Sequence, residues 1–383
     1  SIVAIFLQFA FGVSAGFCSV TSCRVGAHDD AGVRRSLAVQ FLLSGILTVL
    51  LTALALALLD PMLAWINVTP ESGEVYRAAH TYCAVIFAGI GAQLFYNFVC
   101  SFLRSMGDSA TPLAFLLFST VLNVGLDLLF VLVFRWGVAG AAEATVIAQT
   151  LSGAGLAAYT WRRCRELLPL PGEFRLEGAV FRELWGLSSL TCLQQCAMNF
   201  GILLIQRLVD SFGPVTMAAF AAGVKIDAFA YLPVQDFGNA FSTFVAQNYG
   251  AGQSERLRRG FRRAMALSLG FACLLSAAVA GFAEPLMGLF LQPEETAVLA
   301  AGVRYLRIEG AFYPGIACLF LLYGIYRAVR RPGMSVVLTV LSLGTRVALA
   351  YALAGPVGES GIWWAIPIGW FLADAVGLGY YFR

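Results

Sequence analysis

The sequence predicts an all-α membrane protein built from two pseudo-symmetric helical bundles. Three observations predict this class: an apolar composition, many apolar stretches of membrane-spanning length, and an internal repeat. Of the 383 residues, 59% are hydrophobic and only 12% are charged, whereas about 25% of a soluble domain is charged. A soluble protein of this length has too much surface for so few charges, so most of the outer surface should face lipid.

Eleven apolar stretches are long enough to cross about 30 Å of hydrocarbon as helices. They lie at about 2–23, 37–58, 78–103, 111–134, 138–160, 185–209, 215–247, 264–283, 298–326, 333–354 and 361–381. Arginines gather in one alternate set of connecting segments and are rare in the other set. Because positively charged loops remain in the cytoplasm, we expect a multi-pass protein of the inner (plasma) membrane with a cytoplasmic C-terminus.

An internal repeat relates the two halves at an offset of 224 residues. "GAHDDAGVRRS" (26–36) is similar to "GAGQSERLRRG" (250–260), and Pro61 and Pro285 keep the same register. The basic segments coincide, so both halves have one orientation, an arrangement typical of transporters whose substrate path runs between two lobes. We expect an N-terminal lobe at 1–161, a cytoplasmic interlobe linker at 162–184 and a C-terminal lobe at 185–383.

One acid in the N-terminal half stands in an almost purely apolar stretch. Asp127 lies in "VLNVGLDLLFVLVF" (121–134), with Asn123 one turn earlier and Thr145 on the next stretch. Charges at bilayer depth are rare and usually functional, and a carboxylate shielded from water tends to take up a proton or a cation. We predict that Asp127, Asn123 and Thr145 bind the coupling ion, as metal ligands if that ion is Na⁺. The alternative is that Asp127 only hydrogen-bonds a neighbouring helix.

The C-terminal half carries a second group of charges. Lys225, the only lysine of the chain, lies near Asp227 and Asp236, and Arg346 lies on a later stretch. These four residues form a candidate cavity or charge pair. Lys225 either takes part in proton coupling or neutralises a carboxylate between two helices. The repeat places Arg346 against residues 122–123, so the two lobes should be electrically unlike.

The sequence lacks the motifs that other classes of function require. No GxxxxGK[ST] motif and no soluble domain for a nucleotide is present, so active transport should be driven by an ion gradient. No metal cluster or nucleophile–base constellation is evident, and Glu309 and Asp374 are intramembrane acids without an evident partner. We therefore expect no enzyme, no cofactor besides the transported H⁺ or Na⁺, no nucleic-acid or nucleotide partner, and a monomer in the bilayer.

Four segments resemble the multidrug and toxic compound extrusion (MATE) family. They are "STFVAQNYGAGQSERLRRG" (242–260), "SCRVGAHDDAGVRRS" (22–36), "NVGLD" (123–127) and "GVAGAAEATVIAQ" (137–149). The resemblance covers essentially the whole chain. It implies two lobes of six helices that export organic, often cationic, compounds by antiport with H⁺ or Na⁺ through alternating access.

The resemblance also implies that the eleven stretches match helices two to twelve of twelve, with the first helix, which carries a further acid in the family, missing. It implies an N-lobe ion site at Asn123, Asp127 and Thr145. The alternative function is a flippase for lipid-linked saccharides of a related superfamily branch. Such a flippase predicts a cavity rich in arginine, whereas only Arg207 and Arg346 are available in the middle of a span.

Overall fold

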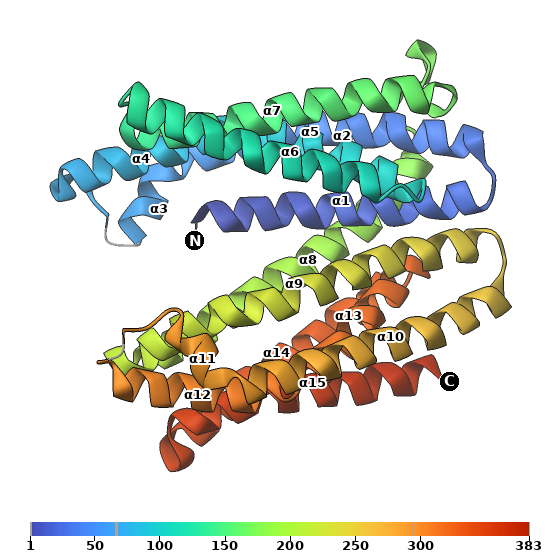
Figure 1. Ribbon diagram of the computed structural model, residues 1–383. Helices are drawn as coiled ribbons and strands as arrows, with labels where there is room; N and C mark the ends of the chain where they lie inside the picture. The colour runs from blue at the N-terminus through green and yellow to red at the C-terminus, as the bar shows by residue number, and fades with distance from the viewer. Residues whose placement is uncertain (1, 66–67, 293, 383) are drawn as a thin grey trace. The chain divides into compact units, whose positions relative to one another are not determined.

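The structure, a computed structural model, describes residues 2–65, 68–292 and 294–382. Every regular element in these residues is a helix and no strand occurs among them, which confirms the predicted all-α class. The chain divides into two compact units, Ser1–Cys192 and Leu193–Arg383, which we call the N-lobe and the C-lobe (Figure 1). The boundary falls inside helix α8 (Gly178–Asp210), past the predicted linker.

The N-lobe contains seven helices and the first part of α8. The helices are α1 (Ile2–Gly26), α2 (Asp30–Ala57), α3 (Leu59–Trp65), α4 (Glu74–Ala88), α5 (Ile90–Ser105), α6 (Ala110–Asp127) and α7 (Gly137–Arg163), with short helical turns at Pro70–Ser72, Arg165–Leu167 and Pro171–Glu173. Its largest core packs Phe17 and Phe87 against Leu184 of α8. All three side chains are almost completely buried, so the start of α8 belongs to this core.

The C-lobe contains the rest of α8 and seven further helices. These are α9 (Pro214–Gly250), α10 (Ser254–Gly281), α11 (Ala283–Gly288), α12 (Thr296–Gly310), α13 (Tyr313–Ala328), α14 (Pro332–Val357) and α15 (Glu359–Tyr381). Its core joins Ile205 of α8, Tyr305 of α12 and Trp363 of α15. With 37 residues, α9 is about 55 Å long, so it extends beyond the hydrocarbon layer.

The helix boundaries confirm the internal repeat. Helices α1 and α9 end at Gly26 and Gly250, and α2 and α10 end at Ala57 and Gly281, so each pair is 224 residues apart. The turn that follows α1 or α9 has a positive φ in both lobes, 56° at His28 and 67° at Gly252. The same local backbone is therefore built twice, once in each lobe.

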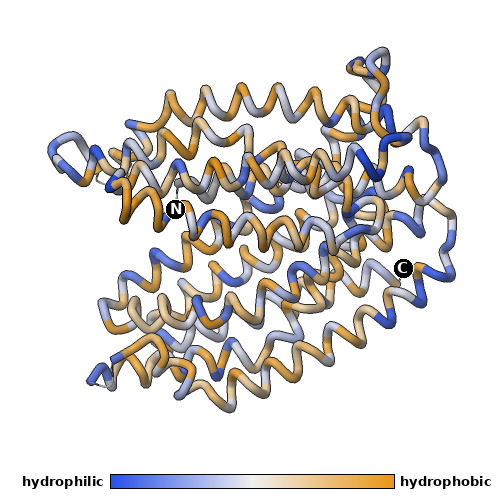
Figure 2. The backbone as a smooth tube through the Cα atoms, turned by 45° about the horizontal axis from the view of Figure 1, so that its top comes forward, coloured by the Kyte–Doolittle hydropathy of each residue, from blue (hydrophilic) through white to orange (hydrophobic). Residues whose placement is uncertain are grey.

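Seven helices in the described residues are long and apolar enough to cross a membrane, and two bent helix pairs raise the number to nine. The pairs are α4–α5, bent by 43°, and α12–α13, bent by 49°. Hydrophilic residues gather mainly near helix ends, while the middles of the helices are mostly hydrophobic (Figure 2). Helices α1 and α7, with 25 and 27 residues, occupy two further predicted spans but are not among the nine. The predicted number of eleven spans is therefore not confirmed.

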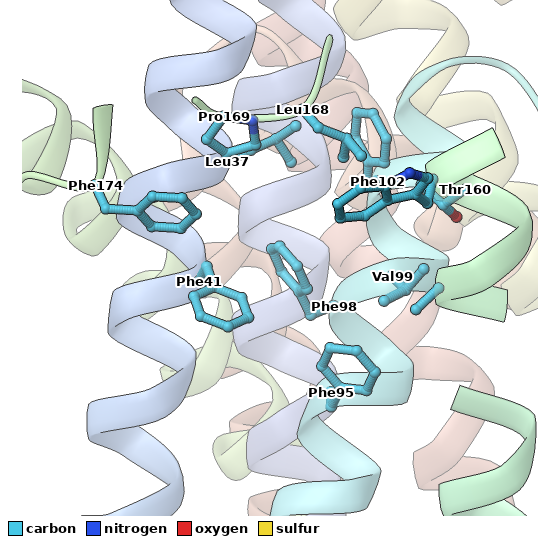
Figure 3. A pocket seen from close by; sticks show the side chains of 12 residues that line it. Leu37, Phe41, Phe95, Phe98, Val99, Phe102, Thr160, Leu168, Pro169 and Phe174 are labelled. Carbon is cyan, nitrogen blue, oxygen red and sulfur yellow. The ribbon is translucent and has the colours of Figure 1, made fainter. Parts of the chain in front are cut away.

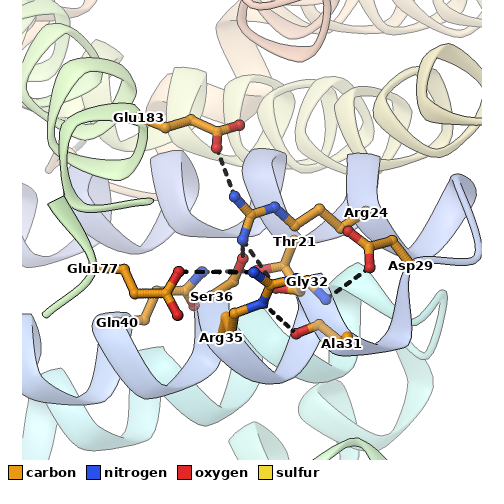
Figure 4. Close-up of polar contacts among 10 residues, drawn as sticks. All are labelled: Thr21, Arg24, Asp29, Ala31, Gly32, Arg35, Ser36, Gln40, Glu177 and Glu183. Carbon is orange, nitrogen blue, oxygen red and sulfur yellow. Dashed lines mark hydrogen bonds and ion pairs between the residues drawn. The ribbon is translucent and has the colours of Figure 1, made fainter. Parts of the chain in front are cut away.

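Ion pairs hold the segment between α7 and α8, and the start of α8, against the end of α1 and the start of α2. The pairs are Arg24–Glu183 (2.6 Å), Arg34–Glu173 (3.3 Å) and Arg35–Glu177 (3.9 Å). Arg24 also donates to the Ser36 hydroxyl and to the Gly32 carbonyl (Figure 4). The predicted linker is thus attached to the N-lobe by its own acids.

Helices α1 and α8 approach closely because two glycines of α1 face α8. A Cβ atom at Gly12 would lie 3.0 Å from Cys192 Cα, and one at Gly16 would lie 2.6 Å from Ser188 Cα. The spacing of four residues places both glycines on one face of α1, a pattern that brings helix backbones together in membranes. This contact fixes the first part of α8 on the N-lobe.

Candidate functional site

The three polar residues predicted in the N-lobe lie on the packed helices α6 and α7. Asn123 Nδ2 donates to Thr145 Oγ1 at 3.3 Å, and Thr145 Oγ1 donates to the Ala141 carbonyl at 3.1 Å. Asp127 lies one turn after Asn123 on the same face of α6. Its Oδ1 is buried and has no hydrogen-bond partner in the described part of the chain. The structure thus joins Asn123 to Thr145 and leaves one oxygen of Asp127 unpaired.

The winding of α6 changes at Asp127. The α-helix ends at this residue, and Leu128–Val133 continue as a π-helix. Short π segments within helices are frequent at functional sites. The ring of Phe130 packs against Trp136 with 4.8 Å between centroids, which anchors the π segment to the turn before α7. Asp127 therefore occupies the junction between two helix geometries.

A cavity of about 210 Å³ in the C-lobe gathers three charged side chains. Asp227 reaches it from α9, Glu309 from α12 and Arg346 from α14, and the remaining wall is mostly apolar and aromatic, including Tyr231 and Trp370. Sites for drug-sized ligands usually measure roughly 300–1,000 Å³. The cavity is therefore sized for a small ion, with or without water, rather than for a drug.

Two tyrosine hydroxyls hold Asp227. Tyr305 of α12 donates to its Oδ2, and Tyr313 of α13 donates to its Oδ1. Asp227 is only 9% exposed, so the two phenols replace the water that a carboxylate would otherwise bind. Because α12 and α13 are the two parts of one bent pair, Asp227 bridges the break between them.

Glu309 and Arg346 keep unsatisfied polar atoms in the same region. Glu309 Oε2 and Arg346 Nε are both buried without a hydrogen-bond partner among the residues that the structure describes. Two acids and one base line the cavity, so it carries a net negative charge when all three groups are ionised. An uncompensated buried charge is strongly unfavourable. One proton or one Na⁺ ion balances it.

Lys225 and Asp236 lie on the opposite face of α9 from Asp227. Both side chains are exposed, and Lys225 Nζ lies 5.8 Å from the ring centroid of Phe290. A helix turns by about 100° per residue, so residues two and nine positions away from Asp227 point away from it. The structure therefore brings Asp227 and Arg346 to one cavity and leaves Lys225 and Asp236 outside it.

Tyr305, Tyr313 and Glu309 were not assigned to a site from the sequence. Tyr305 and Glu309 are four residues apart in a span, a spacing that places two polar groups on one helix face. Pro314 follows shortly afterwards, and proline marks a helix break because it lacks a backbone N–H. Together these signals indicate a polar face at a broken span, but they do not reveal that Asp227 packs against it.

The comparison with family models and curated proteins gives one consistent result. The family model described as MatE matches residues 1–129 and 191–352. A probable multidrug resistance protein, YpnP, of Bacillus subtilis (strain 168) is 28% identical over 100% of this chain and 84% of its own length. The FAD transporter of Shewanella oneidensis is 24% identical over 96% of this chain and 81% of its own length.

Solved structures share the fold over nearly the whole chain. An outward-facing multidrug resistance MATE family transporter of the MOP superfamily has a TM-score of 0.91 at 22% identity, covering 98% of this chain and 84% of its own. A MOP superfamily transporter from Pyrococcus furiosus, reported for the reverse polarity of its binding pocket, also has a TM-score of 0.91 at 22% identity, with 98% and 84% covered. Since the family model matches most of the residues, the chain belongs to the MatE family of membrane transporters.

Proposed function

We propose that the protein exports organic, often cationic, compounds from the cytoplasm across the inner (plasma) membrane by antiport with H⁺ or Na⁺. Relatives named as probable multidrug resistance proteins support this substrate class over the flippase alternative. The arginine-rich ends of the helices face the cytoplasm by the positive-inside rule. Without a nucleotide motif in the sequence, an ion gradient supplies the energy.

The observation that carries this proposal is the charge balance of the C-lobe cavity. Asp227 and Glu309 share it with a single base, Arg346. The cavity is neutral with one added monovalent cation and negative without it. A site that must exchange a cation to stay neutral is what an antiporter requires, because substrate movement can then be linked to occupation of the site.

The bent helix pair provides the link between occupation and conformation. Tyr305 on α12 and Tyr313 on α13 both donate to Asp227, across a bend of 49°. Any change of the bend moves the two phenols relative to each other and alters their bonds to Asp227. A cation at this site therefore favours one bend over another, which is the condition for shifting a conformational equilibrium. Broken helices serve as ion sites in many secondary transporters.

Asp127 supplies a second cation site in the N-lobe in this proposal. Its buried Oδ1 has no partner among the described residues, which argues against a purely structural hydrogen bond at that oxygen. Asn123 and Thr145 add neutral oxygen atoms of the kind that small hard cations prefer. They serve as ligands only if the coupling ion is Na⁺.

The exposed face of α9 supplies one wall of the substrate path in this proposal. It carries Lys225, Asp236 and Phe229, whose side chain is 77% exposed. A charged side chain in the middle of the hydrocarbon costs roughly 2.5–3.5 kcal/mol on insertion scales, so two charges on this face favour contact with water over contact with lipid. The Phe229 ring and the Asp236 carboxylate both attract organic cations.

The experiment that tests this function measures efflux of the organic cation ethidium from liposomes containing the purified full-length protein. We expect efflux when an inward gradient of H⁺ or Na⁺ is imposed, and loss of that response in Asp227→Asn. Glu255→Gln, which alters an exposed acid paired with Arg259, serves as the matched control and should keep the wild-type rate. Efflux that responds to neither gradient in the wild-type protein contradicts the proposal.

A further inference from the structure

A second cavity lies in the N-lobe, where α7 ends and the following segment folds back over α2 and α5 (Figure 3). Its volume is about 440 Å³, within the roughly 300–1,000 Å³ typical of ligand sites. Its lining is aromatic and aliphatic, with Phe41, Phe98 and Phe174 around the space in Figure 3. The hydroxyl of Thr160, which also lines it, already donates to the Leu156 carbonyl at 2.8 Å. The cavity therefore suits an apolar ligand.

The rim of this cavity is open to the surroundings of the protein. Trp161 is 62% exposed, Phe41 is 46% exposed and Phe174 is 41% exposed. In a membrane protein such a rim at the end of a span lies near the boundary between hydrocarbon and headgroups, where tryptophan is enriched. The apolar ligand that is always present at this depth is a lipid acyl chain.

Three exposed arginines lie in the sequence between the lining residues Trp161 and Leu168. Arg162 and Arg163 follow Trp161 in the last turn of α7, and Arg165 lies in the next helical turn, before the lining residue Leu168. All three side chains are exposed. Arg162 and Arg165 form no ion pair with any residue in the described ranges. An apolar cavity with cationic groups at its mouth matches a molecule with an acyl chain and an anionic headgroup.

The neighbouring acids leave this positive charge largely available. Glu173 and Glu177 are already engaged by Arg34 and Arg35. Asp108 lies near Arg163. Desolvation raises the pKa of Asp108, but hydrogen bonds from Thr111, together with Arg163, lower this pKa overall. Asp108 is therefore ionised and offsets part of the positive charge. Glu166 is the remaining acid of the segment between α7 and α8, and its side chain is exposed. Three arginines against these two acids leave a net positive mouth.

We propose that this N-lobe cavity binds an anionic phospholipid of the cytoplasmic leaflet, with one acyl chain among the phenylalanines and the phosphate on Arg162, Arg163 and Arg165. Basic pockets between spanning helices on the cytoplasmic side bind anionic headgroups through the same combination of forces. The bound lipid spans α2, α5, α7 and the segment leading to α8. It therefore stabilises the attachment of that segment to the N-lobe.

The test compares lipid binding by native mass spectrometry of the purified full-length protein in detergent, with phosphatidylglycerol and phosphatidylcholine of identical acyl chains. We expect at least fivefold more retained phosphatidylglycerol in the wild-type protein. The triple variant R162Q/R163Q/R165Q should lose that preference, and Ala157→Phe, which fills the cavity, should lower binding of both lipids. The triple variant R182Q/R258Q/R262Q removes the same charge from exposed positions outside the cavity and should behave as wild type.

A thermal-unfolding series in inorganic phosphate separates a lipid site from a simple anion site. We expect phosphatidylglycerol, and not inorganic phosphate, to raise the unfolding midpoint of the wild-type protein, and R162Q/R163Q/R165Q to abolish the shift. Equal retention of the two lipids, an undiminished preference in R162Q/R163Q/R165Q, or an equal shift with inorganic phosphate would each overturn the proposal. The arginine variant alters only exposed side chains, so it is expected to fold.

Discussion

The two lobes share one pattern of helices but surround the same helix break with different chemistry. The pairs α4–α5 and α12–α13 are bent by 43° and 49° at equivalent positions of the repeat. In the C-lobe, Glu309 and Tyr313 flank the break beside a cavity. In the N-lobe, a Cβ atom on Gly89, at the break, would lie 2.4 Å from Val146 Cγ2. The N-lobe break is therefore closed by packing, while the C-lobe break borders a cavity lined by charged side chains.

The distribution of ion pairs shows the same contrast. The N-lobe uses arginines of α1 and α2 to hold the segment before α8 and the first turns of α8, as in Arg24–Glu183. The described residues of the C-lobe contain no such attachment, and its equivalent of Arg35, Arg259, pairs only with Glu255 one turn away. The repeat thus sets where helices bend, whereas a few side chains at the bend decide whether charged groups and a cavity lie beside it.

The largest expected effect comes from Glu309→Gln. This change leaves Asp227 and Arg346 as a balanced pair, so the cavity no longer needs a cation to be neutral. We expect gradient-driven ethidium efflux to fall at least about tenfold, equivalent to roughly 1.4 kcal/mol, while ethidium binding in detergent remains. An efflux rate equal to that of the wild-type protein contradicts a coupling role for the C-lobe break.

Asp127→Asn tests the N-lobe site in the same way. The N-lobe site has one acid at a half-buried position, so we expect a smaller loss, about threefold in efflux rate, or roughly 0.6 kcal/mol. The same assay with Asn123→Ala shows whether the amide contributes. If Asp127→Asn abolishes efflux while Glu309→Gln leaves it intact, the roles of the two lobes are reversed.

Tyr305→Phe sharpens the account of how Asp227 is held. Loss of one hydrogen bond to a buried carboxylate costs about 1.5–3 kcal/mol, so the thermal unfolding midpoint should fall. Tyr326→Phe is the matched control, because Tyr326 donates to the Gly377 carbonyl at 2.6 Å in the same lobe. Both variants should lose stability, but only Tyr305→Phe should change the dependence of the midpoint on Na⁺ or pH. The same dependence in both variants contradicts an ion site at Asp227.

The smallest effect is expected from Glu173, in the segment between α7 and α8. A hydrogen bond from the Leu170 backbone N–H, together with Arg34, lowers the pKa of Glu173 below its ordinary value. Its contribution to stability is therefore fully present above the ordinary carboxylate pKa of about 4.3 and is lost as the pH falls through the lowered pKa. Hydrogen exchange of residues 164–177 should be faster in Glu173→Gln than in the wild-type protein at pH 7. The two proteins should converge once the pH has fallen below the lowered pKa of Glu173; a constant difference at all pH values contradicts this assignment.

Most of the fold followed from the sequence because its signals are local or periodic. Apolar length predicts spans, and the matching turns at 26–36 and 250–260 predict the repeat that the helix ends at Gly26 and Gly250 confirm. The C-terminal end of the interlobe linker was harder to predict. Helix α8 begins at Gly178, inside the predicted linker, because its first turns bury Val180 and Leu184 in the N-lobe core and pair Glu183 with Arg24.

The site was predicted less completely because its contacts join distant helices. Asp227 and Arg346 were both expected in a C-lobe cavity, but a single sequence does not show that α12 lies between them and contributes Glu309 and Tyr305. Lys225 drew attention as the only lysine, yet helix geometry turns it away from Asp227. The coupling roles of Asp127, Asn123 and Thr145 remain predictions, to which the structure adds an unpaired oxygen on Asp127.

The most direct test counts the cations released when ethidium binds to the purified full-length protein. Proton release is measured in weakly buffered solution and Na⁺ release with a sodium electrode, for the wild-type protein and Glu309→Gln. If the C-lobe cavity exchanges one monovalent cation for substrate, the variant releases one equivalent fewer than the wild type. Identical release from both proteins contradicts the account.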